Sequence, residues 1–231
     1  MNIIHKYPTS SNFIKNEVKT LEFIISRGLL NKYVDLNSTI QNLYYQYNAK
    51  LKKESKFDFL LHANFKMEIE GHNHEVVIGA NVLNDFSICS YFLAIAGKND
   101  DEKKLIRKFH FDYALPTIAT LQKVPIFHLQ YGGKASPEMG NLGLCGDKLD
   151  GWLSLPRLNF APINLALLLD TLLCEFRTVS TNEIVESSEW RSLIYHNESF
   201  LLSSYFENIA AHIKSSKFNK NSLVRDFYYG S

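Results

Sequence analysis

The chain lacks paired cysteines, an excess of charge of either sign and any long apolar run. Its three cysteines, at positions 89, 145 and 174, lie far apart and form no Cys-x-x-Cys motif, which argues against a structural zinc site or a disulfide framework. A reducing compartment suits this cysteine content, so we expect a cytoplasmic protein. The net charge of +1 argues neither for nor against nucleic acid as a partner.

The absence of long apolar segments bears on membranes. Residues 163 to 173 form the longest apolar stretch, and Asn164, Asp170 and Thr171 interrupt it. A membrane-spanning helix needs about 20 consecutive apolar residues, so this stretch is far too short. The first residues contain no basic segment followed by an apolar one, which is the pattern of a signal peptide. We therefore expect a soluble protein that neither spans nor binds a membrane.

Two hydrophobic periods divide the chain. Residues 11 to 54 carry apolar side chains at spacings of three and four, which predict two helices. From residue 57 the period changes to two, which is typical of strands. We expect turns at residues 71–74 and 97–101, and five strands at residues 57–70, 75–84, 87–96, 104–113 and 124–131. Successive strands with short polar connections predict an antiparallel meander.

The second half of the chain has a different composition. Residues 132–162 hold six of the eleven glycines up to position 151 and then two prolines, so we expect a loop there. Residues 163–177 and 188–215 are predicted to be helices. The chain thus reads as one α+β domain over residues 1–231, with a helical layer at 1–55, a sheet at 56–131, a loop at 132–162 and helices at 163–216. Helices from both ends should cover one face of the sheet and leave the other face open.

Polar residues on the fourth and fifth predicted strands form the main candidate site. Because residues two apart share a face of a strand, His110 and Asp112 share one face of the fourth strand, with Lys108 beside them. His128 and Gln130 share one face of the fifth strand. If these strands pair in the right register, the side chains meet on one surface; a slip of one residue would separate them.

This polar set suits two kinds of chemistry. An imidazole is a base that titrates near neutral pH, and a carboxylate can orient it, so His110, Asp112 and His128 are candidate catalytic residues. The same three side chains could hold a divalent metal, which is the one cofactor we consider. Lys108, Gln130 and Arg157 are candidate ligand-binding residues; Arg157 lies in a proline-flanked segment and could clamp a phosphate or carboxylate. The simpler interpretation is an ordinary solvated sheet face, because half-buried antiparallel sheets alternate in this way.

Other motifs are weaker. His72 and His74 give only two metal ligands at the predicted turn. Lys134 follows two glycines, but the pattern of a phosphate-binding loop is incomplete, which argues against an NTPase. Cys145 lies in a loop of small residues without a local signature of a nucleophile.

Two hypotheses about function follow from these patterns. The first is a soluble binding or assembly protein whose open polar sheet face and glycine-rich loop contact a protein partner or an anionic ligand. The second is a hydrolase, metal-assisted or not, that acts on a phosphoester through His110, Asp112 and His128.

Overall fold

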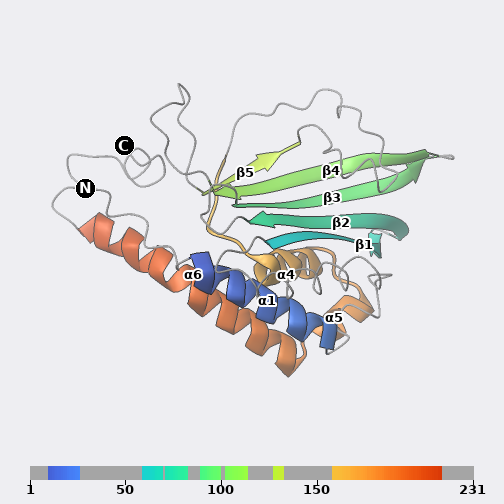
Figure 1. Cartoon of the computed structure of the whole chain (residues 1–231). Helices are drawn as coiled ribbons and strands as arrows, with labels where there is room; N and C mark the ends of the chain where they lie inside the picture. The colour runs from blue at the N-terminus through green and yellow to red at the C-terminus, as the bar shows by residue number, and fades with distance from the viewer. Residues whose placement is uncertain are drawn as a thin grey trace, which may run out of the picture.

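The computed structural model describes residues 10–26, 59–69, 71–82, 89–99, 102–113, 127–132 and 158–214. An antiparallel sheet and a group of helices make up these residues, which confirms the α+β class (Figure 1). The predicted helix near residues 35–54 lies outside the described residues, as does most of the glycine-rich loop, including Cys145 and Arg157. No helix in the described segments is long and apolar enough to cross a membrane.

The sheet has six antiparallel strands in the order of the sequence. The strands are β1 (Phe59–Ile69), β2 (His72–Val82), β3 (Cys89–Asn99), β4 (Glu102–Tyr113), β5 (Phe127–Tyr131) and β6 (Leu158–Asn159). The two-residue strand β6 was not predicted, because it lies within residues 132–162, where the glycines and prolines indicated a loop. It pairs with β5, and the Phe160 amide donates to the Phe127 carbonyl beside it at 3.1 Å.

Two predicted turns are shorter than expected. The turn predicted over residues 71–74 is wrong, because β2 already begins at His72. Gly71 has a φ of 77°, a left-handed conformation that glycine adopts without steric cost, so the chain reverses close to this residue. Between β3 and β4, Asn99 pairs with Glu102, and the register shifts between Ile95 and Ala96. Both hairpins therefore extend the sheet further than the pattern of polar residues suggested.

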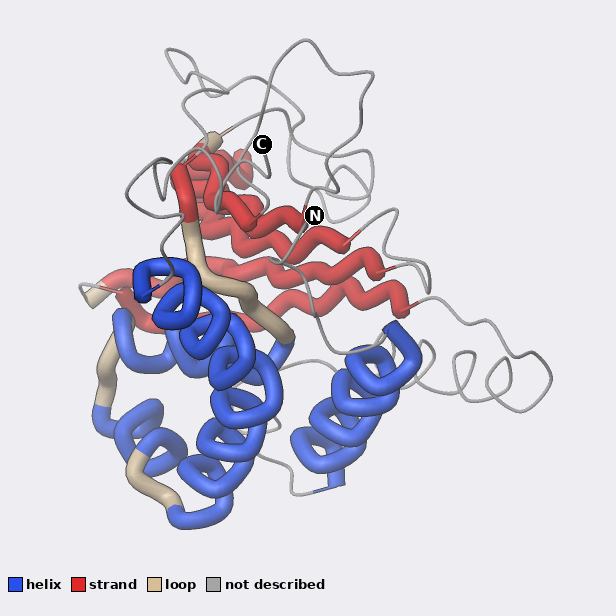
Figure 2. Tube along the Cα trace, turned by 90° about the vertical axis from the view of Figure 1, so that its left-hand side faces the viewer, coloured by secondary structure: helices blue, strands red, loops and turns tan. Residues whose placement is uncertain are grey.

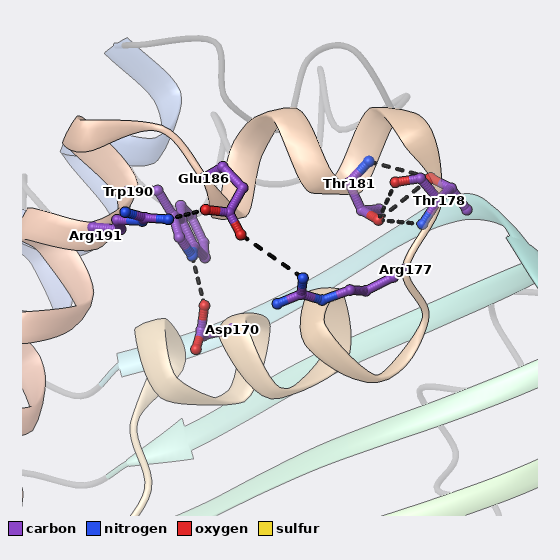
Figure 3. Close-up of polar contacts among 7 residues, drawn as sticks. All are labelled: Asp170, Arg177, Thr178, Thr181, Glu186, Trp190 and Arg191. Carbon is purple, nitrogen blue, oxygen red and sulfur yellow. Dashed lines mark hydrogen bonds and ion pairs between the residues drawn. The ribbon is translucent and has the colours of Figure 1, made fainter.

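The described helices gather on one side of the sheet (Figure 1, Figure 2). They are α1 (Ser10–Ser26), α4 (Leu165–Glu175), α5 (Val179–Val185) and α6 (Ser188–Lys214). Asn164 caps α4, because its side chain accepts from the Leu167 amide at 3.1 Å. The helix α5 was not predicted; it begins at a capping box in which Thr178 and Thr181 each bind the other's backbone amide (Figure 3).

Polar contacts join the last three helices. Trp190 of α6 is 1% exposed, and its indole Nε1 donates to Asp170 of α4 at 2.7 Å (Figure 3). Glu186 follows α5 and forms ion pairs with Arg177 and Arg191 on the surface of the helical group (Figure 3). A buried tryptophan with a satisfied N–H fixes α6 against α4, whereas exposed ion pairs contribute little to stability.

One face of the sheet packs against the helices and forms the core. Alternate residues of β2 and β3 point to this face, and those from Val76 to Val82 and from Cys89 to Ile95 are buried. They join the apolar residues of α4 and the inner side of α1 and α6 in one cluster. The sheet residues of this cluster that are fully described are Val76, Ile78, Ala80, Val82, Cys89, Tyr91, Leu93, Ile95 and Phe111.

Candidate functional site

The strand register brings the predicted polar set together on the face that points away from the helices. Asp112 lies opposite His128, and His110 lies opposite Gln130. Lys108, two residues before His110, shares their face because side chains alternate along β4. The alternative of a one-residue slip is therefore wrong, and we call this group of five side chains the polar set.

The contact between His128 and Asp112 in the polar set is long. His128 Nε2 lies 3.6 Å from Asp112 Oδ2, which is too long for a direct hydrogen bond. A cavity of about 10 Å³ lies beside both residues, and such a volume has room for about one water molecule. The His110 ring lies 6.1 Å from the ring of Phe92 on the neighbouring strand. The cavity beside Asp112 and His128 is far too small for a substrate.

The expectation of an open face is wrong for the middle of the polar set. Lys108 is 2% exposed and His128 is 5% exposed, while Asp112 retains 26%. Val77 and Ala94, on the same side of β2 and β3, are also completely buried. The sequence pattern placed polar residues on one face, but it could not show that this face is covered. A partner that docks on the sheet could not reach Lys108 or His128.

Burial also changes the acid–base chemistry of His110. Desolvation lowers its pKa to about 4, and the neighbouring positive charge of Lys108 acts in the same direction. Asp112 opposes this shift by favouring the imidazolium, and His128 adds to the lowering. A base with this pKa is neutral at pH 7 and accepts a proton poorly, because general bases work best near the operating pH. The arrangement therefore supports catalysis weakly.

No group of three or more His, Cys, Asp or Glu side chains in the described segments is arranged to hold a metal ion. The metal-binding role of His110, Asp112 and His128 therefore stays a prediction. His72 and His74 lie on β2, not in a turn, and the His74 ring nitrogen Nδ1 contacts the His72 carbonyl at 2.9 Å. Arg157 lies outside the described residues, so its predicted role stays a prediction.

A much larger cavity lies on the other face of the sheet, between the strands and α4. Its volume is about 600 Å³, within the range of about 300–1,000 Å³ that is typical of small-molecule sites. Nine of the fourteen lining residues are apolar. The apolar lining residues are Ile69, Leu93, Ile95, Phe109, Phe111, Leu129, Phe160, Leu172 and Phe176, and the polar ones are His72, His74, Arg107, Thr171 and Glu175.

The floor and the mouth of this cavity differ in chemistry. Four of the apolar residues belong to the buried core: Leu93, Ile95, Phe111 and Leu172. Most polar residues are exposed, His74 being half-buried, and they come from the start of β2, the middle of β4 and the last turns of α4. An apolar floor with a few polar groups at the entrance is the usual construction of a ligand pocket.

A buried polar network lies deeper, where α1 meets the sheet and the start of α4. Glu17 of α1 is completely buried; its Oε2 accepts from the Tyr91 hydroxyl at 2.8 Å and from the Leu165 amide at 3.1 Å. Burial raises the pKa of Glu17 to about 7, and the two hydrogen bonds limit the shift. Next to it, the Asn197 side-chain oxygen accepts from Asn16 and Asn164, both at 2.7 Å.

The Glu17 network and the large cavity were both missed by the sequence analysis. Phe13, Glu17, Thr20 and Ile24 follow one another at spacings of four, three and four, so they share one face of α1. Polar residues within an apolar stripe are the signal that would have indicated a buried network. The cavity had no such signal, because its lining residues alternate like those of any core strand.

Comparisons with protein-family models, with curated proteins and with solved structures find no match to this chain.

Proposed function

We propose that this protein is a non-catalytic binding protein that takes one small apolar molecule into the cavity between α4 and the sheet. The single observation that carries the proposal is a cavity of about 600 Å³ with an apolar, buried floor. Protein interiors are normally close-packed, with few voids larger than a water molecule. Water in a space lined by Leu93, Phe111 and Leu172 finds few hydrogen-bond partners, so an apolar ligand would replace it favourably.

The walls of the cavity support a preformed site. Five strands, β1 to β5, supply the sheet side, and α4 and the residue after it supply the opposite side through Leu172 and Phe176. The helix α4 is fixed in turn by its Asn164 cap and by the Trp190–Asp170 hydrogen bond. A site built on rigid elements loses little conformational entropy when it binds a ligand.

The phosphoester hydrolase is the less well supported hypothesis. The Asp112–His128 pair favours it, because a carboxylate near an imidazole is a common arrangement for proton transfer. Against it stand the burial of His128, the lowered pKa of His110 and the size of the adjacent cavity, about 10 Å³.

A titration with a fluorescent apolar probe tests the proposal. The probe, for example N-phenylnaphthylamine, should bind the wild-type protein with one-to-one stoichiometry. In the Leu129→Trp variant the larger ring points into the cavity from a half-buried position, so the probe should bind at least about tenfold more weakly.

The matched control is Leu129→Met, which keeps the side-chain volume and should keep probe affinity. Near-ultraviolet circular dichroism would verify that both variants are folded. Equal probe affinity in the wild type and in a folded Leu129→Trp variant would contradict binding in this cavity.

A further inference from the structure

The charged residues of the cavity are divided between its two walls. Arg107 of β4 lies on the sheet side, and His72 and His74 of β2 lie on the same side. Ile95 pairs with Arg107 and with Val76, so a single strand separates β2 from β4. Because neighbouring strands lie about 4.8 Å apart, β2 and β4 are about 10 Å apart. His74 and His72 lie two and four residues along β2 from Val76, so both are farther than this from Arg107, and His74 is the nearer.

The helix side of the mouth carries the opposite charge. Glu175 is exposed at the last residue of α4, and Thr171 lies one turn earlier. The Thr171 hydroxyl donates to the Leu167 carbonyl at 2.8 Å, so its proton is already used within the helix. A negatively charged ligand group would therefore be attracted by the sheet wall and repelled by the end of α4.

Arginine is well suited to receive such a group. Its guanidinium is always charged and offers parallel N–H donors that match a carboxylate. The His72 imidazole can supply a further N–H donor, whereas the His74 ring already donates from Nδ1 to the His72 carbonyl and offers a second N–H only as the imidazolium. Below this rim the cavity continues to the aromatic and aliphatic floor at Phe109 and Phe111. The polar end of a ligand could thus contact the rim while its apolar end packs on the floor.

We propose that the ligand is an amphipathic organic acid, with its hydrocarbon part on the apolar floor and its carboxylate at Arg107, on the wall that also carries His72 and His74. This inference rests on the proposed function, since it concerns the same cavity. It adds the charge and the orientation of the ligand: the carboxylate lies at the sheet side of the mouth, away from Glu175.

Three ligands with the same hydrocarbon chain test the charge: dodecanoate, dodecanol and dodecylamine. Each is used to displace the fluorescent probe below its solubility limit, and the acid and the amine also below their micelle concentrations. Dodecanoate should bind about tenfold more tightly than dodecanol, because a hydrogen-bonded ion pair at the mouth adds to the same apolar contacts. Dodecylamine should bind most weakly. Equal binding of the acid and the alcohol, or tighter binding of the amine, would overturn the inference while leaving apolar binding in place.

Variants at the two walls locate the carboxylate. Arg107→Gln should remove most of the preference for the acid and leave the affinity for dodecanol unchanged. Arg107→Lys, which keeps the charge but not the fork of donors, should retain part of the preference. Glu175→Gln should raise the affinity for dodecanoate about two- to threefold, without an effect on dodecanol.

An unchanged acid preference in Arg107→Gln would refute the placement of the carboxylate. If none of the three ligands displaces the probe from the wild-type protein, the proposed function itself fails. These outcomes separate the failure of the inference from the failure of the function on which it rests.

Discussion

The two faces of the sheet contradict the expectation from their sequence patterns: the polar face is closed, and the apolar face adjoins a large cavity. The face with histidines, a lysine and an aspartate is covered at its centre, and the space beside Asp112 and His128 has room for about one water molecule. The face with phenylalanines, leucines and isoleucines adjoins a cavity of about 600 Å³. Polar residues on a strand therefore did not indicate where a ligand can enter; the distance between α4 and the sheet decides that.

Each face of the sheet also buries an ionisable group, and the two groups have different surroundings. Glu17 reaches the helix-facing side and receives two hydrogen bonds, from Tyr91 and from the Leu165 amide. His110 lies on the opposite side, next to Lys108 and Asp112. Desolvation is the largest cause of the pKa shift in both residues. The shifts have opposite signs because burial disfavours the charged form, which is the base for Glu and the acid for His.

The largest expected effect concerns stability on the helix-facing side. Leu169 of α4 is 1% exposed and does not line the cavity, so Leu169→Ala should lower the free energy of unfolding by about 2–5 kcal/mol. The matched control on the other face is Asn81→Ala, at an exposed position, which should change it by less than about 0.5 kcal/mol. Urea unfolding measures both. Equal effects would mean that the core is not where the packing of α4 places it.

The next effect is a pair of opposite pH dependences. Glu17 has a pKa of about 7 in the folded protein against a usual 4.5, so its stabilising contribution is complete below pH 4.5 and is lost as the pH rises to 7. His110 has a pKa of about 4 against 6.5, so its contribution is complete above pH 6.5 and is lost as the pH falls to 4. Each contribution is on the order of 3 kcal/mol, and in the wild type the two largely cancel.

Two variants separate these contributions in urea unfolding at a series of pH values. Glu17→Gln keeps an oxygen for Tyr91 and removes the ionisation, so its stability should fall on acidification from pH 6.5 to 4.5. His110→Asn should become more stable over the same interval. Parallel pH profiles for both variants and the wild type would show that neither group is desolvated as described.

A smaller effect is expected at Gly79, which lies opposite Phe92 in the sheet. A Cβ at this position would overlap the Phe92 ring, so Gly79→Ala should lower the free energy of unfolding by about 1–3 kcal/mol. Adding Phe92→Ala should recover part of this loss, because it removes the overlapping ring. A double-mutant cycle measures the coupling, and strict additivity would contradict the contact.

The smallest effect is predicted for the polar set itself. Asp112→Asn removes the charge that faces His128 at 3.6 Å, and it should change the free energy of unfolding by less than about 1 kcal/mol. Probe binding in the cavity on the opposite face should be unchanged. A tenfold loss of probe affinity in this variant would place the binding site on the polar face after all.

The sequence predicted local features of the sheet better than its surroundings. Alternation predicted that His110 and Asp112 share one face of β4 and that His128 and Gln130 share one face of β5, because side chains in a strand alternate wherever the strand lies. The register that brings the two pairs together was left open. Alternation could not predict that Lys108 and His128 are buried, since the cover of a face comes from distant parts of the chain. Gly71 predicted a chain reversal but not its length, because His72 is polar and still belongs to β2.

The cavity and the Glu17 network depend on tertiary packing. Leu93, Phe111 and Leu129 have the sequence pattern of core residues, and only the position of α4 decides whether they meet a helix or a space. Glu17 is polar, yet it lies on the apolar stripe of α1 with Phe13, and its partners are 74 and 148 residues away in the sequence. Contacts at such separations are not visible in local patterns.

An isotope-filtered nuclear Overhauser experiment tests the central claim most directly. The protein would carry labelled methyl groups, and dodecanoate would be added at a saturating concentration. The account predicts contacts between the ligand chain and the methyl groups of Leu93, Ile95, Leu129 and Leu172, which line the cavity. Contacts with Val77 and Ala94, which are buried on the opposite face, or no contacts with any methyl group, would contradict it.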